Sequence, residues 1–157
     1  LVACEIAAWC KANGRTMYQY MIDIYKKVGV YQEALVNVVR KGRTGAEEIA
    51  QMMVDFRENP VKELAGSKVL EVKDFQEQTC LNVITGEKKV MNDIPKSNVL
   101  IYYTEDGTKV CIRPSGTEPK IKFYFSVKDK IENEADFKAK QASLEQKINE
   151  VKKDLKL

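Results

Sequence analysis

The fold of this chain is decided by the stretch VLIYYTEDGTKVCIRPSGTEPKIKFYFSV, residues 99–127. Its first five residues form a continuous apolar run, which predicts a central β-strand. Asp106-Gly107 predicts a tight hairpin turn. Residues 109–113 and 120–127 alternate polar and apolar side chains with the period of a half-buried strand. Because short turns join these three segments, we expect the strands to run antiparallel.

The segments on either side of this stretch add helices to the sheet. Helices are predicted over residues 1–12, 16–29, 44–58 and from about residue 133 or 134 onward, and further strands over residues 31–40 and 69–72. Capping boxes are predicted at Thr16 with Gln19 and at Thr44 with Glu47. Residues 88–97, which carry Asn, Asp, Pro and Ser, predict a loop. This order predicts an α+β fold, an antiparallel sheet with helices packed on one face, preceded by a short helical pair.

The composition excludes several kinds of catalytic and metal-binding site. The 157 residues include no histidine, which excludes Ser-His-Asp and Cys-His nucleophiles, histidine bases and histidine-ligated zinc. The 26 Lys and Arg nearly balance the 23 Asp and Glu, so the net charge of +3 does not argue for nucleic acid. No apolar run could span a membrane, and no signal peptide is visible. The cysteines form no C-x-x-C pair, and we expect idle thiols in a reducing cytoplasm; they are Cys4, Cys10, Cys80 and Cys111.

The loop from Arg113 to Pro119 is the segment whose side chains suggest a binding site. Two prolines fix its ends, and Gly116 permits a positive φ that would turn successive backbone amides into one concavity. The side-chain donors are the planar fork of Arg113, the hydroxyls of Ser115 and Thr117, and the ammonium groups of Lys120 and Lys122 on the next strand. Such donors suit an anion with several oxygens, for example a phosphate monoester. The alternative is a turn whose polar side chains satisfy its own backbone.

The residues of this segment carry a resemblance. The stretch from Arg113 to Tyr124 resembles the C-terminal phosphate-binding loop of the α-D-phosphohexomutases, the family of phosphoglucomutases and phosphomannomutases. Residues 3–9 and 16–29 resemble the last helices of that family's third domain, and residues 94–100 and 105–107 resemble its fourth domain. The resemblance implies a C-terminal domain of the TATA-binding-protein-like class. It also implies a domain boundary near residue 29, with residues 1–29 ending an upstream domain and residues 30–157 forming the phosphate-binding domain.

The resemblance further implies an activity for a longer parent enzyme. Such an enzyme interconverts hexose 1-phosphate and hexose 6-phosphate through a phosphoserine and a bisphosphate intermediate, with Mg²⁺ and glucose 1,6-bisphosphate as cofactors. This part would grip the phosphate that is not being transferred. The phosphate-binding residues implied are Arg113, Ser115, Gly116, Thr117 and Lys122.

This chain departs from the family in what it lacks. It has no phosphoserine loop, no Asp-rich metal loop and no sugar-selecting loop. We therefore expect no catalytic or metal-binding residues, no cofactor bound here, and no mutase activity from this part alone. The expected partners are a phosphosugar substrate and the upstream domains of the same chain, with no nucleic acid and no membrane.

Two other functions stay open at this point. A phosphate loop on a sheet of this class would also suit a module that binds the phosphate backbone of nucleic acid. The amphipathic final helix would suit a dimerisation domain. Two further residues are assigned roles near the loop: Glu118 is expected to orient Arg113 or Lys122, and Arg43 could touch an anion at a helix N-terminus.

Overall fold

The computed structural model describes residues 1–42 and 44–157. The helices are α1 (Val2–Ala12), α2 (Met17–Val28), α3 (Gly45–Glu58) and α4 (Phe137–Asp154), with a 3-10 helix η1 (Glu134–Asp136). The strands are β1 (Val30–Val39), β2 (Glu63–Leu64), β3 (Ser67–Asp74), β4 (Thr79–Asn82), β5 (Lys88–Val90), β6 (Leu100–Thr104), β7 (Lys109–Pro114) and β8 (Lys120–Asp129). Helices and strands therefore occur together, as the sequence predicts.

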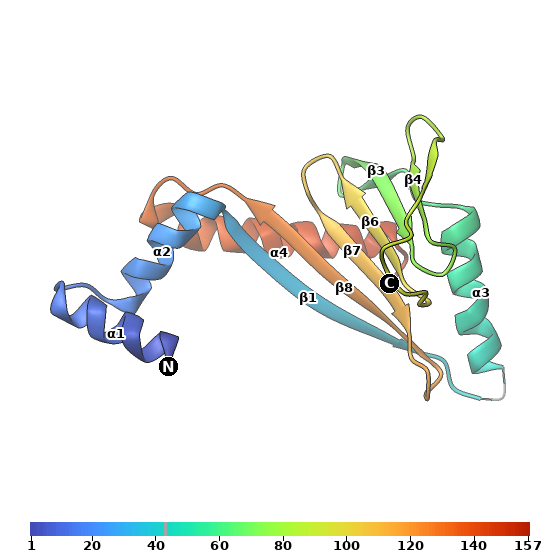
Figure 1. Cartoon of the computed structure of the whole chain (residues 1–157), viewed down its shortest axis with the longest axis horizontal. Helices are drawn as coiled ribbons and strands as arrows, with labels where there is room; N and C mark the ends of the chain where they lie inside the picture. The colour runs from blue at the N-terminus through green and yellow to red at the C-terminus, as the bar shows by residue number, and fades with distance from the viewer. Residues whose placement is uncertain (43) are drawn as a thin grey trace. The chain divides into compact units, whose positions relative to one another are not determined.

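These strands form one sheet in the order β1-β8-β7-β6-β3-β4-β5, with β2 paired to β3 off this path (Figure 1). The pairs from β3 to β8 are antiparallel. The three strands of the opening stretch, β6, β7 and β8, are consecutive neighbours near the middle of the sheet. The antiparallel arrangement predicted from their short turns is confirmed.

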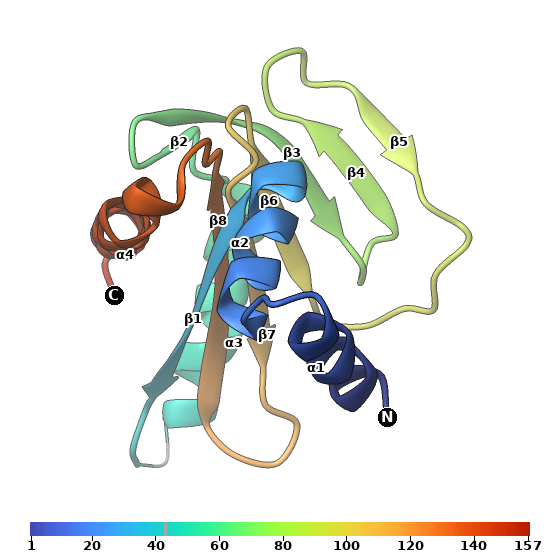
Figure 2. The ribbon, with the colours of Figure 1, turned by 90° about the vertical axis from the view of Figure 1, so that its left-hand side faces the viewer.

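One face of this sheet is covered by helices and the other is open. Phe56 of α3 packs edge-on against Phe123 of β8, with 5.8 Å between ring centroids. The C-terminal part of α4, from residue 146, belongs to the same compact unit as these strands. Figure 2 shows β4 and β5 at the end of the sheet away from β1. The buried side chains of the strands include Leu100, Tyr102, Val110, Ile112, Ile121, Phe123 and Phe125, and those near the end of the chain include Ile148, Val151 and Leu155. Side chains on the opposite face, such as Cys111 and Tyr124, are half-buried or exposed, so the predicted one-sided packing is confirmed.

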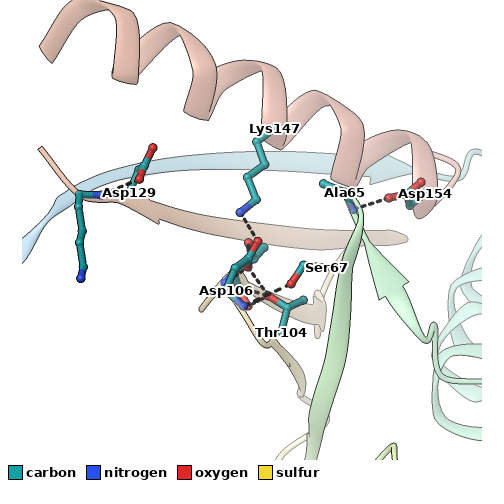
Figure 3. Close-up of polar contacts among 9 residues, drawn as sticks. Ala65, Ser67, Thr104, Asp106, Asp129, Lys147 and Asp154 are labelled. Atoms are coloured by element: carbon teal, nitrogen blue, oxygen red, sulfur yellow. Dashed lines mark hydrogen bonds and ion pairs between the residues drawn. The ribbon is translucent and has the colours of Figure 1, made fainter. Parts of the chain in front are cut away.

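The turn between β6 and β7 is organised by the carboxylate of Asp106. Its Oδ1 accepts hydrogen bonds from the amide of Thr108 at 3.0 Å and from the hydroxyls of Thr108 at 2.8 Å and Thr104 at 2.7 Å. Its Oδ2 pairs with Lys147 of α4 (Figure 3). Gly107 follows with a φ of +82°, a left-handed conformation that glycine adopts without strain. The predicted hairpin is confirmed.

One predicted capping box forms and the other does not. The Thr16 hydroxyl accepts from the Gln19 amide at 3.1 Å, and the Gln19 side chain accepts from the Thr16 amide at 2.9 Å. The box predicted at Thr44 and Glu47 is wrong, because the Thr44 hydroxyl donates to the Glu48 carboxylate instead. Thr44 has a helical backbone, with φ −88° and ψ −7°, whereas a capping residue needs an extended one.

The loop predicted over residues 88–97 is wrong in its first part. Lys88–Val90 forms β5, which pairs with residues 79–81 of β4. The pairing runs along the outer edge of the sheet, where all three β5 side chains are exposed. An exposed edge strand lacks the alternation of buried and polar residues by which a strand is recognised in a sequence.

The chain divides into two compact units. The first comprises residues 1–32 and 128–145, and the second comprises residues 33–127 and 146–157. In the first unit Phe137 stacks on Tyr25, with 5.5 Å between ring centroids, and Trp9 meets Tyr20 edge-on at 5.7 Å. The second unit holds most of the sheet and the loop of interest. The boundary expected at residue 29 of a longer protein stays a prediction.

Candidate functional site

The candidate site is the loop that joins β7 to β8. Its stem is set by register: Arg113 lies directly opposite Lys122, and Pro114 lies opposite Ile121. Ile112 and Ile121 point into the core, so the alternation of the strands places Arg113 and Lys122 on the open face. The Ser115 amide donates to the Lys120 carbonyl at 2.8 Å and closes the base of the loop. The strand register therefore brings two of the predicted phosphate-binding residues side by side.

Arg113 and Lys122 form a pair of like charges. Among the residues that the structure describes, no carboxylate lies within ion-pair distance of either side chain. Like charges directly opposite each other on neighbouring strands destabilise a sheet. A bound anion would remove this repulsion and would receive charge-assisted hydrogen bonds from both sides.

The tip of the loop presents donors that have no acceptor. Within the described chain, the backbone amides of Gly116, Thr117 and Glu118 make no hydrogen bond, and neither do the hydroxyls of Ser115 and Thr117. A turn that exists for its own stability uses such groups to satisfy its backbone. This loop leaves them open to solvent, which disfavours the reading of a self-satisfied turn.

Gly116 serves the loop in a way that differs from the expectation. Its φ does not lie in the left-handed region, so the expected positive φ is wrong. A Cβ built at Gly116 would meet no heavy atom within 4 Å, so packing does not require glycine either. What glycine provides here is an uncovered backbone at the tip, to which a ligand can approach closely.

The role expected for Glu118 is corrected by the structure. Its carboxylate forms an ion pair with Lys120, which is adjacent to the loop, and Lys122 attracts it without forming an ion pair. The hydrogen bond from Lys120 lowers the pKa of the Glu118 carboxyl. Lys120 is thereby engaged within the loop, and Lys122 is the lysine left available on the open face.

The open face beside the loop carries a shallow groove of about 500 Å³. Its lining residues include Leu35 of β1, Lys109 and Cys111 of β7, and Tyr124 and Ser126 of β8. Burial raises the pKa of the Cys111 thiol, although Lys109 and Arg113 oppose this effect. Cys111 is therefore a poorly ionised thiol beside the loop and not an activated nucleophile.

Neither a metal centre nor a membrane span is found in the described part of the chain. No group of three or more Cys, Asp or Glu side chains there could hold a metal ion. No helix among the described residues is both long enough and apolar enough to cross a bilayer.

One contact of the loop is invisible to sequence reasoning. The amide of Arg40, at the end of β1, donates to the Pro119 carbonyl at 3.0 Å. Backbone contacts between segments this far apart leave no motif. The glycine spacing at Gly42 and Gly45 was the available signal that the chain passes closely here. Arg43, suggested as an anion contact, lies outside the described residues.

A family model and related sequences indicate one family. The family model described as "Phosphoglucomutase/phosphomannomutase, C-terminal domain" matches residues 35–142. A phosphoglucomutase of Staphylococcus saprophyticus is 34% identical over 115 residues, covering 73% of this chain and 20% of that protein. A phosphoglucomutase of Staphylococcus aureus is 34% identical over 124 residues, covering 79% and 22%. The chain thus spans about a fifth of the length of these relatives. An open-form crystal structure of the phosphoglucomutase pp63/parafusin from Paramecium matches with TM-score 0.43 and 16% identity, over 88% of this chain and 23% of that one.

Proposed function

Because this chain belongs to the phosphoglucomutase/phosphomannomutase family, whose C-terminal-domain model matches most of it, we propose that its β7–β8 loop binds the phosphate group of a phosphorylated sugar. The groups that bind are the guanidinium of Arg113, the hydroxyls of Ser115 and Thr117, the amide of Gly116 and the ammonium of Lys122.

The observation that carries this proposal is the set of donors without acceptors. The tip amides and hydroxyls and the opposed pair Arg113–Lys122 lie within one loop and its stem. A phosphate monoester has the oxygens and the negative charge to accept from all of them. Charge-assisted hydrogen bonds contribute about 1.5–3 kcal/mol each, so three or four formed together would hold the group.

In a full-length protein this grip serves a mutase reaction. The loop holds the phosphate of a hexose 1-phosphate or 6-phosphate that is not being transferred, while a phosphoserine elsewhere in the protein exchanges phosphoryl groups with the other end of the sugar. The bisphosphate intermediate then binds in either orientation, because the loop recognises a phosphate and not the sugar. We also propose a cytoplasmic location, because the four cysteines are free thiols, as is usual for proteins of a reducing compartment.

The role of this chain is to bind the phosphate group and to orient the sugar that carries it. It supplies no nucleophile to the reaction. We propose that the Mg²⁺ of the reaction is held elsewhere in the full-length protein. With neither a phosphoserine nor a metal loop in its sequence, the chain on its own should show no mutase turnover.

The proposal is tested by measuring the affinity of this chain for inorganic phosphate and for glucose 6-phosphate by NMR titration. We expect both to bind with a Kd of about 1 mM, because a single loop without closing domains provides about 4 kcal/mol. Arg113→Ala should weaken binding about 10-fold or more. The matched control is Lys109→Ala, which removes a cation from the same strand and face outside the loop.

Equal affinities in the wild type and in Arg113→Ala would contradict the proposal. Tighter binding of a random oligonucleotide than of glucose 6-phosphate, with a steep dependence on salt, would support the nucleic-acid alternative in its place.

A further inference from the structure

We propose that the hydrogen bond from the Arg40 amide to the Pro119 carbonyl acts as a latch that sets the phosphate affinity of the β7–β8 loop, and that Gly45 is the positioning residue that holds this latch. The inference rests on the proposed function, because it names what keeps the binding loop in shape. The latch is this one hydrogen bond.

Hydrogen bonds hold the loop at its two ends, and the Lys120 amide also donates to the Glu118 carbonyl at 2.7 Å. The Ser115 amide donates to the Lys120 carbonyl at 2.8 Å, which ties the two arms of the loop together. Pro119 has no amide proton, so its carbonyl is the only backbone group with which it can bond. That carbonyl accepts from Arg40 at 3.0 Å, and this is the bond that ties the loop to the end of β1. The position of the tip donors relative to β1 therefore depends on where Arg40 lies.

Arg40 is in turn fixed by the first residue of α3. A Cβ built at Gly45 would lie 2.3 Å from the Arg40 carbonyl oxygen and 2.9 Å from its carbonyl carbon. Real Cβ atoms do not approach backbone atoms so closely, and backbone cannot rotate away as a flexible side chain can. Gly45 does not have a positive φ, so space is the reason for glycine at this position. Helix α3 can begin this close to β1 because Gly45 has no side chain.

A second contact joins Arg40 to the same helix. The Arg40 guanidinium pairs with Glu48, one turn into α3, at 3.4 Å. Arg40 thus contacts the helix through its carbonyl and its side chain, and it contacts the loop through its amide. A displacement of the first turn of α3 would therefore move Arg40, and Arg40 would in turn move the phosphate loop.

This arrangement predicts the effect of Gly45→Ala. The added methyl group forces the Arg40 carbonyl away, which strains or breaks the latch and leaves the loop free to sample open shapes. Part of the free energy of phosphate binding is then used to order the loop. The affinity for phosphate should therefore fall about fivefold or more, at the lower end of usual coupling between sites. Exchange of the Arg40 amide proton with solvent should accelerate in the same variant without ligand.

The matched control is Gly86→Ala, in the turn between β4 and β5. Its φ of +75° makes alanine strained there, yet a Cβ would meet no atom within 4 Å. This substitution lowers stability without touching α3, β1 or the loop. If the effect of Gly45→Ala came from lost stability alone, Gly86→Ala would weaken phosphate binding as well. We expect it to leave the affinity within about twofold of wild type.

The same coupling can be measured in the wild-type chain, with no substitution. Coupling between two sites is reciprocal, so bound phosphate must strengthen the latch as much as the latch strengthens phosphate binding. Saturating inorganic phosphate should slow exchange of the Arg40 amide about fivefold. An amide of the same sheet far from the loop, such as that of Val72, should not change.

The outcomes separate the latch from the proposed function. Phosphate binding in the wild type with unchanged Arg40 exchange, or with equal affinity in Gly45→Ala, would overturn the latch and leave the phosphate site standing. An absence of phosphate binding in the wild type would overturn both. Slowed Arg40 exchange together with weakened binding in Gly45→Ala alone is the result that the inference requires.

Discussion

Lys147 of α4 forms an ion pair with Asp106 in the turn between β6 and β7. The Asp106 carboxylate lies partly buried, and its second oxygen accepts from Thr104 and Thr108. Burial by itself would raise the pKa of this carboxyl, but the hydrogen bonds from Lys147, Thr104 and Thr108 more than offset it. Its pKa therefore lies well below the ordinary range. One carboxylate thus joins the central hairpin to the C-terminal helix.

The first prediction concerns this carboxylate and pH. Because the folded state holds the pKa of Asp106 below its unfolded value, the stability it contributes is complete above about pH 5 and is lost progressively as the pH falls below that. Asp106→Asn should cost about 1–2 kcal/mol of unfolding free energy at pH 7. The difference from wild type should shrink toward pH 2, as measured by urea denaturation. A difference that does not change with pH would remove Asp106 from this role.

A second prediction concerns the end of α3. The Phe56 carbonyl cannot find its usual partner four residues on, because that residue is Pro60. The Tyr102 hydroxyl, fully buried, donates to this carbonyl at 2.5 Å. Tyr102→Phe leaves the carbonyl buried without a donor and should cost about 1–3 kcal/mol. The control Tyr103→Phe keeps the ring that lies over Lys73 and should cost less than about 0.5 kcal/mol by the same urea titration.

Thiol reactivity gives a third prediction. Cys4 is exposed, Cys10 is buried, and burial raises the pKa values of Cys80 and Cys111. Iodoacetamide at pH 8, followed by peptide mass spectrometry, should modify Cys4 about fivefold or more faster than Cys111, and Cys10 last. Faster alkylation of Cys111 than of Cys4 would show that the open face is not arranged as described.

A fourth prediction follows from the Glu118–Lys120 pair. The Glu118 carboxylate sits beside the loop and repels an incoming anion, while it also occupies Lys120. Glu118→Gln should therefore tighten phosphate binding about two- to threefold at low salt, and the gain should fade as salt screens the charges. A weaker affinity in this variant would mean that the pair is needed to shape the loop.

Much of the fold could be predicted because its central strands follow simple patterns. Buried and more exposed side chains alternate without exception over residues 120–127. Asp106-Gly107 is a sequence typical of a hairpin turn. The parts that could not be predicted depend on partners far away in the sequence. Residues 88–90 become a strand only because β4 offers an edge, and Thr44 fails to cap because its backbone is already helical.

The candidate site likewise has features that could be predicted from the sequence and others that could not. The donor types and their order in the loop could be read from residues 113–122, since phosphate needs such groups close together. The contacts that these groups make could not be predicted, because they depend on three-dimensional placement. The tip amides make no hydrogen bond, Glu118 pairs with Lys120, and Gly116 does not have a positive φ. The hydrogen bond from the Arg40 amide to the Pro119 carbonyl joins residues far apart in the sequence, and Gly42 and Gly45 only hint that the chain passes closely there.

The most direct test of the central claim is the response of individual amide protons in the wild-type chain to added inorganic phosphate. The amides of Gly116, Thr117 and Glu118 have no acceptor among the described residues, so an anion held by the loop should become that acceptor. Their proton resonances should move downfield together along one binding curve, while those of Lys109 and Ser126 in the neighbouring groove stay in place. Shifts confined to the groove, or the absence of any shift at saturating phosphate, would contradict the claim that this loop binds phosphate.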